Sequence, residues 1–129
     1  MTRNLKRIAY VEDEPDIRAV AELALTVVGG YELNVSEDGE QAIRNIPAFS
    51  PDLILLDVMM PGMTGLELLR IIKKIPGISD TPVIFITAKA PTYELDQYRD
   101  LGAVGGIPKP FDPMMLPAQV QELWIAANS

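Results

Sequence analysis

The chain has 129 residues, of which 48% are hydrophobic and 22% charged, and its formal net charge is −7. This composition is typical of one globular domain with a sizeable core, and it disfavours intrinsic disorder and a basic surface for direct nucleic-acid binding. The chain has neither Cys nor His, which excludes disulfides, thiol catalysis, imidazole metal ligands and a phosphohistidine of its own. No apolar run reaches the length of a signal peptide or a membrane span, so we expect one cytoplasmic domain over residues 1–129.

Five apolar runs of strand character alternate with five segments of helical character. In chain order, the prediction is a strand at 8–11, a helix from Pro15 to Gly29-Gly30, a strand at 31–35, a helix opened by 36–39, a strand at 53–56, a helix begun by Thr64, a strand at 82–87, a helix at 92–101, a strand around 105–107, and a last helix that begins at Asp112-Pro113 or only at Pro117. This alternation predicts an α/β fold, in which a parallel sheet carries helices on both faces and the crossovers are right-handed.

Two helices carry further signals in the sequence. Apolar residues recur at helical spacing in the first helix, at Ile17, Val20, Ala21, Ala24, Val27 and Val28. In the second helix, Pro47 is expected to end the helix early, because proline lacks the N–H that would continue the hydrogen-bond ladder.

The strand at 53–56 organises the rest of the chain. Its four consecutive aliphatic residues predict burial on both faces, because a half-exposed strand would alternate with polar residues. It delivers Asp57 at its carboxyl end, shortly before the Pro61-Gly62 turn. Ligands of open parallel sheets bind in the crevice beyond the strand carboxyl ends, so we interpret Asp57 as a functional group.

Polar side chains follow four of the predicted strands at the same edge of the sheet. Glu12 and Asp13 follow the first strand, Asp57 the third, Thr87 the fourth and Lys109 the fifth. Taken singly, each has a simpler explanation: the acids can be favourable charge at a helix N-terminus, the threonine can cap a turn, and the lysine can be solvated. Their convergence on one crevice favours a shared site.

Three converging acids favour a divalent cation. Two carboxylates about 4 Å apart repel by roughly 4 kcal/mol at an effective dielectric near 20, so the cluster must raise a pKa, admit a cation or lose stability. A ligand set made only of oxygen atoms, with no His nitrogen or Cys sulfur, suits Mg²⁺. Lys109 would lie opposite the acids as a point charge. Asp57 can then act as a nucleophile towards phosphorus, while Thr87 donates a hydrogen bond to the transferred group.

Four segments resemble the receiver domain of response regulators in bacterial two-component signalling. They are the acidic segment 11–18, the segment 55–65 around Asp57, the segment 86–88 with Thr87, and the segment Lys109-Pro110-Phe111. The resemblance covers essentially the whole chain and implies a flavodoxin-like (βα)5 fold, doubly wound, with five parallel strands in the order 2-1-3-4-5.

The resemblance also implies a role for each site residue. Asp57 would be the phosphoacceptor, while Thr87 and Lys109 would hold phosphoryl oxygens and the Lys109–Pro110 bond would be cis. The implied Mg²⁺ ligands are Asp57, Asp13, the backbone carbonyl of Met59 and, through water, Glu12.

The implied activity is signalling, with no turnover of a small substrate. Asp57 would accept the phosphoryl group from a partner histidine kinase or histidine phosphotransfer protein, and the chain would hydrolyse the aspartyl phosphate slowly itself. We expect a monomer or weak homodimer that contacts an unknown downstream protein, without nucleic acid or membrane. The segment 101–116, followed by Gln119-Val120 and Trp124, resembles single-domain receivers, although the length also fits a receiver cut from a longer protein.

Two residues depart from the family pattern. Many receivers carry Tyr or Phe three residues before the lysine, as the rotating partner of the switch threonine, whereas this chain has Gly106. Transmission through an aromatic residue on the fifth strand is therefore not expected. Glu12 stands where Asp is commoner, with a longer arm and the same charge.

Two alternatives from other classes fit the residues less well. A phosphatase of the haloacid-dehalogenase type would need a second Asp two residues after Asp57, where this chain has Met59, which cannot transfer a proton. A flavodoxin-like module for a nucleotide or flavin would need a Gly-rich phosphate loop after the first strand, where the acidic segment 12–14 would repel phosphate.

Overall fold

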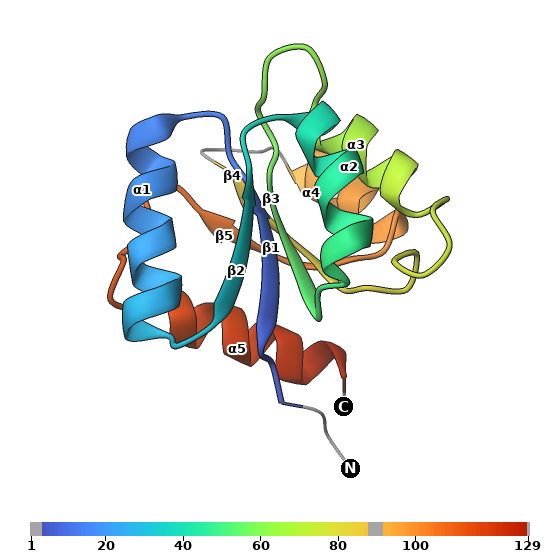
Figure 1. The fold of residues 1–129 in the computed structure, drawn as a ribbon. Coiled ribbons are helices and arrows are strands. Elements are labelled where there is room, and N and C mark those ends of the chain that lie inside the picture. Colours follow the sequence, from blue (N-terminus) through green and yellow to red (C-terminus); the bar gives the residue numbers. More distant parts are fainter. Residues whose placement is uncertain (1–3, 88–91, 129) are drawn as a thin grey trace.

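The computed structural model describes residues 4–87 and 92–128, with the backbone alone at 92–95. Five strands form one parallel sheet in the order β2-β1-β3-β4-β5 (Figure 1). Their bounds are β1 Arg7–Val11, β2 Glu32–Ser36, β3 Leu53–Asp57, β4 Val83–Thr87 and β5 Ala103–Pro108. The predicted strand order and the doubly wound parallel sheet are confirmed.

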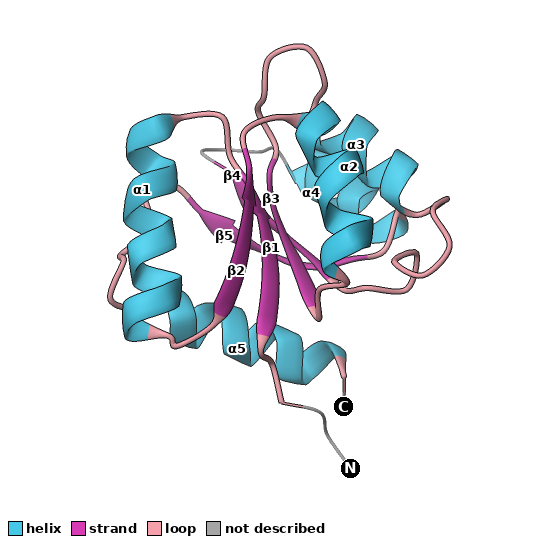
Figure 2. Ribbon diagram, viewed as in Figure 1, coloured by secondary structure: helices cyan, strands magenta, loops and turns pink. Residues whose placement is uncertain are grey.

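Helices cover both faces of this sheet, as Figure 2 shows. Helix α1 continues directly into the π-helical segment η1, and it shares its face of the sheet with α5; α2, α3 and α4 cover the other face. The bounds are α1 Pro15–Leu23, η1 Ala24–Val28, α2 Gly39–Phe49, α3 Gly65–Ile72, α4 Thr92–Asp100 and α5 Leu116–Ala127. Within the described ranges, no helix is long and apolar enough to cross a membrane.

Strand β3 lies at the centre of two hydrophobic clusters, and all five of its residues are buried. Ile54 and Leu56 pack on the side of α2, α3 and α4, whereas Leu53 and Leu55 pack on the side of α1 and α5. The predicted burial on both faces is confirmed. Since a parallel sheet aligns its carboxyl ends, the central strand delivers Asp57 next to the ends of β1 and β4.

The expectation that Pro47 ends α2 early is wrong. The helix continues to Phe49, because the proline lies in its last turn and only one ladder hydrogen bond is lost. The Ser50 N–H still donates to the Ile46 carbonyl, and an Arg7 guanidinium N–H donates to the Phe49 carbonyl. These contacts hold the turn that follows the proline.

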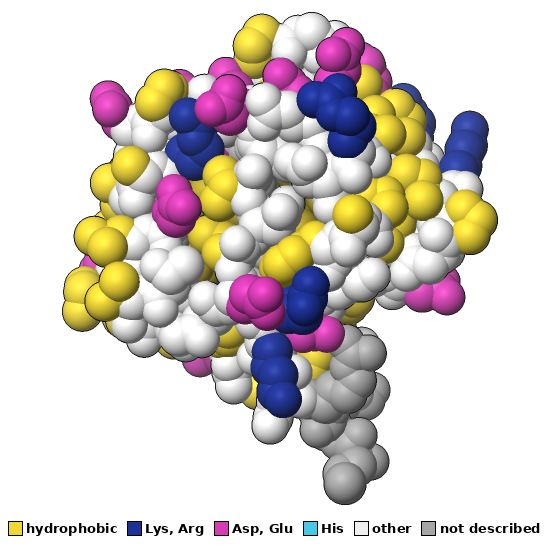
Figure 3. Space-filling view, in the orientation of Figure 1, with side chains coloured by type: hydrophobic (Ala, Val, Ile, Leu, Met, Phe, Trp, Pro, Cys, Tyr) yellow, Lys and Arg dark blue, Asp and Glu magenta, His cyan; other side chains and the backbone are white. Residues whose placement is uncertain are grey.

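The apolar spacing of the first helix is only partly reflected in its burial. Ala21, Ala24 and Leu25 are buried, whereas Val27 is 71% exposed. The cause is the wider π turn, in which the Gly29 N–H donates to the Ala24 carbonyl five residues earlier and so rotates the end of the helix. Hydrophobic side chains gather on the surface over α1 (Figure 3).

The last helix follows the second of the two predicted starts. Asp112 accepts a hydrogen bond from the Met114 N–H through its carboxylate, and its carbonyl accepts from the Met115 and Leu116 N–H groups. Regular α5 begins at Leu116, with Pro117 in its first turn, where a proline has no ladder bond to lose.

Candidate functional site

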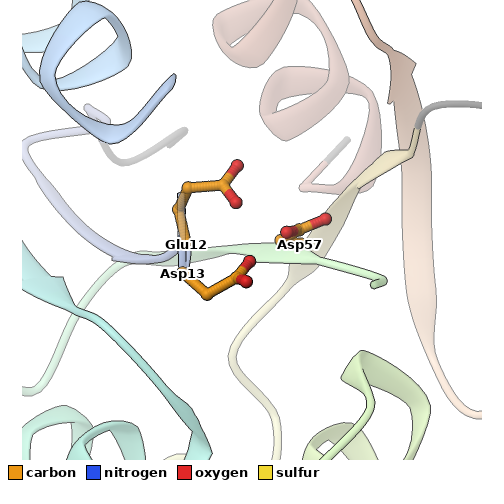
Figure 4. A group of neighbouring side chains, drawn as sticks. All are labelled: Glu12, Asp13 and Asp57. Carbon is orange, nitrogen blue, oxygen red and sulfur yellow. The ribbon is translucent and has the colours of Figure 1, made fainter. Parts of the chain in front are cut away.

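Three carboxylates meet beyond the ends of β1 and β3. Glu12 and Asp13 directly follow β1, and Asp57 is the last residue of β3, the strand that pairs with it. Each residue offers an oxygen to a group whose members all lie within 4.8 Å of one another, and the side chains turn toward one another in Figure 4. The structure therefore brings together the acids that the sequence analysis grouped.

Lys109 completes the cluster from the end of β5. Its Nζ lies 2.9 Å from Glu12 Oε1 and 3.3 Å from Asp57 Oδ1. The Lys109 N–H donates to the Thr87 carbonyl at 2.8 Å, and the Lys109–Pro110 bond is cis, as expected from the resemblance. The main chain thus fixes where the lysine enters the site.

Burial sets the protonation of these groups. Glu12 is completely buried and Asp57 is 2% exposed, so their charges have little access to water. Burial raises the pKa of Asp57 to about 7, and the Glu12 carboxylate adds to this rise. Burial would also raise the pKa of Glu12, but hydrogen bonds with Asp57 and Lys109 hold it below its usual value. Burial would lower the pKa of Lys109, and its contacts with the two acids raise it instead. Without a further cation, the cluster therefore favours a proton on Asp57.

The donor set fits a hard cation. One lysine faces three acids, so full ionisation leaves an excess of negative charge that a divalent ion would balance. Within the described part of the chain, Asp13 Oδ1 is buried and accepts no hydrogen bond. A buried carboxylate oxygen of this kind is an unusual cost unless a ligand coordinates it. All candidate ligands are oxygens, which suits Mg²⁺.

The turn after β3 holds Asp57 closely. The Met59 N–H donates to Asp57 Oδ1 at 3.2 Å, and the Gly65 N–H donates to the Val58 carbonyl at 3.0 Å. A Cβ at Gly65 would lie 2.5 Å from the Asp57 carbonyl oxygen, so only glycine fits where α3 begins. Thr64 caps this helix through its Oγ1, as predicted.

Thr87 ends β4 beside this turn. Its strand neighbour Ile86 pairs in register with Asp57, and Thr87 itself pairs with Pro108 and is half-buried. Ala88, which belongs to the predicted switch segment, lies outside the described residues.

Two supporting residues were missed by the sequence analysis. The buried Tyr10 hydroxyl donates to Glu12 Oε1 at 3.4 Å. Arg18 Nη1 donates to the Glu12 and Asp13 carbonyls at 3.0 and 3.4 Å, and its Nη2 lies 3.6 Å from Glu37. A basic residue in the first turn of the helix that follows the acids is the signal that could have found Arg18. These two side chains hold the acidic segment in place.

A cleft of about 540 Å³ opens beside the acids, between α1 and the segment after β5. Asp57 and Lys109 supply its charged end, and the other lining residues are Glu14, Asp16, Ile17, Val20, Met59, Pro110 and Phe111. Asp57 is therefore buried and yet lines this cleft.

Comparisons with known proteins agree with this geometry. Residues 8–121 match the family described as "Response regulator receiver domain". The phosphate regulon transcriptional regulatory protein PhoB of Pseudomonas aeruginosa is 40% identical over 116 residues, which are 90% of this chain and 50% of that protein. The DNA-binding response regulator MtrA of Mycolicibacterium smegmatis is 34% identical, over 90% of this chain and 49% of its own. This chain spans about half the length of the curated relatives it matches.

Solved structures give the same result. The chemotaxis protein CheY4 of Vibrio cholerae superposes with a TM-score of 0.86 at 28% identity, over 93% of this chain and 99% of that one. A CheY-like response regulator receiver domain protein from Methanospirillum hungatei superposes with a TM-score of 0.84 at 27% identity, over 96% of this chain and 97% of that one. The chain belongs to the response regulator receiver domain family.

Proposed function

We propose that Asp57 accepts a phosphoryl group from a partner protein and that the resulting aspartyl phosphate changes which proteins the chain contacts. The observation that carries this proposal is the placement of Asp57, a buried carboxylate at the end of a cleft, with Lys109 and two further acids around it. A cluster of this kind is costly in the free protein, so we infer that it serves chemistry and not stability.

We propose that Asp13, Asp57 and the Met59 backbone carbonyl hold Mg²⁺, with Glu12 acting through a water molecule. The unsatisfied Asp13 oxygen and the all-oxygen donor set support this assignment. When bound, the cation would neutralise charge on the phosphoryl oxygens and on Asp57.

The chemistry at Asp57 is nucleophilic. One carboxylate oxygen forms a bond to phosphorus while the bond between phosphorus and the donor breaks, and the donor leaves with that electron pair. Lys109 already contacts Asp57, and its ammonium group would pair with one oxygen of the phosphoryl group on Asp57. The Thr87 hydroxyl would donate a hydrogen bond to another phosphoryl oxygen. Water would later cleave the aspartyl phosphate slowly, so the reaction on the chain is self-phosphorylation and self-dephosphorylation without turnover of a small substrate.

We propose a histidine kinase or a histidine phosphotransfer protein as the donor. The chain contains no His, so a phosphohistidine donor must lie outside these 129 residues. The names of PhoB and MtrA refer to transcription and DNA binding in proteins about twice as long. Because this chain carries a net charge of −7, we propose that its own output is a contact with a downstream protein.

Small phosphodonors test the proposal directly. Acetyl phosphate with Mg²⁺ should produce a phosphorylated species in intact mass spectrometry, and removal of Mg²⁺ or the Asp57→Asn substitution should abolish it. Asp52→Asn, which changes an acid at the opposite end of β3, is the matched control and should leave the adduct intact. Equal adducts on the wild-type and Asp57→Asn proteins would refute the assignment of Asp57.

A further inference from the structure

Tyr10 of β1 lies directly beneath the acids of the site. It precedes Glu12 by two residues where the strand ends, so the two side chains point to the same side of the sheet. Both residues are completely buried. The Tyr10 ring packs in the core on the side of α1 and α5, and its hydroxyl donates to Glu12 Oε1 at 3.4 Å. The core thus presents one polar group to the site from below.

The same oxygen of Glu12 has a second donor, the ammonium group of Lys109. Lys109 Nζ lies 2.9 Å from Glu12 Oε1 and 3.3 Å from Asp57 Oδ1. The other Glu12 oxygen, Oε2, accepts from the Glu14 N–H at 3.4 Å. In the metal-free protein, the ion pair with Lys109 is therefore the strongest contact of the buried carboxylate, and Tyr10 adds a longer hydrogen bond to the same oxygen.

The balance between the two donors changes when Asp57 carries a phosphoryl group. In the proposed reaction the Lys109 ammonium group pairs with a phosphoryl oxygen, so Glu12 Oε1 loses its ion pair. A buried carboxylate oxygen that is left without a donor lowers the stability of the site. The Tyr10 hydroxyl is already within reach of this oxygen, and its hydrogen bond can shorten once Lys109 has turned away.

We propose that Tyr10 is a positioning residue, which holds the Glu12 carboxylate in place toward Mg²⁺ while Lys109 pairs with the phosphoryl group. The glutamate arm brings one oxygen within reach of both donors, whereas an aspartate, shorter by one methylene, would withdraw it by roughly 1.5 Å. Glu12 and Asp13 leave the main chain on opposite sides (Figure 4), so the hydroxyl supports only the first acid. The inference rests on the proposed Mg²⁺ and phosphoryl chemistry and adds the residue that supports Glu12 in it.

Tyr10→Phe tests the inference, because it removes the hydroxyl and keeps the ring. The melting temperature is measured as Mg²⁺ is added in excess beryllofluoride, a mimic of the phosphoryl group. The Mg²⁺ concentration at half of the rise should increase roughly three- to tenfold, as expected for the loss of one hydrogen bond. Tyr31→Phe is the matched control, since its hydroxyl donates to Gln121 Oε1 away from the acids, and it should leave this midpoint unchanged. In a chelator, Tyr10→Phe should change the melting temperature no more than the control does.

A double-mutant cycle separates an action through Glu12 from a general effect on the core. In the Glu12→Asp background the carboxylate is withdrawn from the hydroxyl, so adding Tyr10→Phe should leave the Mg²⁺ midpoint nearly unchanged. An unchanged midpoint in the single variant Tyr10→Phe, or a full increase that persists in Glu12→Asp, would overturn the inference and leave the proposed function standing. A wild-type protein whose melting temperature does not respond to Mg²⁺ with beryllofluoride would overturn both. The single variant decides the matter if Glu12→Asp itself does not respond.

Discussion

Strands β3 and β5 both deliver a charged residue to the site, but they are built differently. β3 is aliphatic and completely buried, and it carries Asp57. β5 lies at the edge of the sheet, contains Gly105 and Gly106, and carries Lys109 after its last residue. Asp57 thus sits on a strand that is completely buried, whereas β5 is a partly exposed edge strand with two consecutive glycines. The comparison separates a buried central strand from a partly exposed edge strand.

The largest expected effect is on core packing. Leu56→Ala in β3 should lower the free energy of unfolding by about 2–5 kcal/mol, because it leaves a cavity between buried side chains. Gly106→Ala in β5 should change the free energy of unfolding by less than about 0.5 kcal/mol, since among the described residues the added methyl group would meet only the Phe85 carbonyl oxygen, at 3.8 Å. Urea denaturation measures both. Similar losses in the two variants would show that β5 is packed as tightly as β3.

Gly105 provides a control within β5 itself. A Cβ there would lie 2.7 Å from a methyl carbon of Leu123 on α5, so Gly105→Ala should be clearly more destabilising than Gly106→Ala. The loose packing is therefore expected only on the α4 face of the strand.

The second effect is the pH dependence of the metal-free protein. Asp57 has a pKa of about 7 in the folded state against an ordinary 3.8, so the native state binds this proton more tightly than the unfolded chain does. The stabilisation is therefore fully present below about pH 4 and is lost as the pH rises through 7. Asp57→Asn should remove this loss and make the protein more stable than wild type at pH 8, by roughly 2–4 kcal/mol.

Glu12 affects the stability of the folded state in the opposite direction. Its pKa is lowered on folding, so its stabilising contribution is present at higher pH and is lost as the pH falls. Urea denaturation between pH 5 and 9 in the presence of a chelator would separate the two groups. Parallel profiles for the wild type and Asp57→Asn would contradict the raised pKa of Asp57.

Mg²⁺ should act on the same cluster with a somewhat smaller effect. At about 100 times its dissociation constant, the ion should stabilise the folded state by roughly 2.7 kcal/mol and raise the melting temperature accordingly. Asp13→Asn should weaken this response, because it replaces the unsatisfied carboxylate oxygen, whereas the exposed Glu40→Gln on α2 should not. A melting temperature that does not change when millimolar Mg²⁺ is added would exclude a shared cation site.

The fold and the main site residues could be predicted because their signals are local. Four consecutive aliphatic residues before Asp57 leave no exposed face for the strand, and parallel strands then bring Asp13, Asp57 and Lys109 to one edge. The cis bond at Lys109–Pro110 needed the family resemblance, because spacing and polarity alone do not favour the cis form.

The remaining features depend on contacts that the sequence does not display. The π turn of η1 leaves Val27 exposed, although Val27 fits the helical repeat of the first helix. Pro47 lies inside α2, and Arg7, a residue far away in the sequence, contacts the end of that helix. The stack of Tyr98 on Phe85 explains what secures a helix whose own sequence is weakly amphipathic. In each case tertiary packing overrides the local signal.

The smallest expected effect concerns Arg18, which supports the acidic segment after β1 from its place on α1. Arg18→Met should lower the free energy of unfolding by about 1–2 kcal/mol, because the Glu12 and Asp13 carbonyls lose a charged hydrogen-bond donor. It should also slow phosphorylation by acetyl phosphate several-fold more than the exposed Arg70→Met in α3, since the acidic segment would no longer be held against β3. The two variants remove the same charge, so equal phosphorylation rates would mean that the sheet alone positions the acids and that Arg18 contributes only to stability.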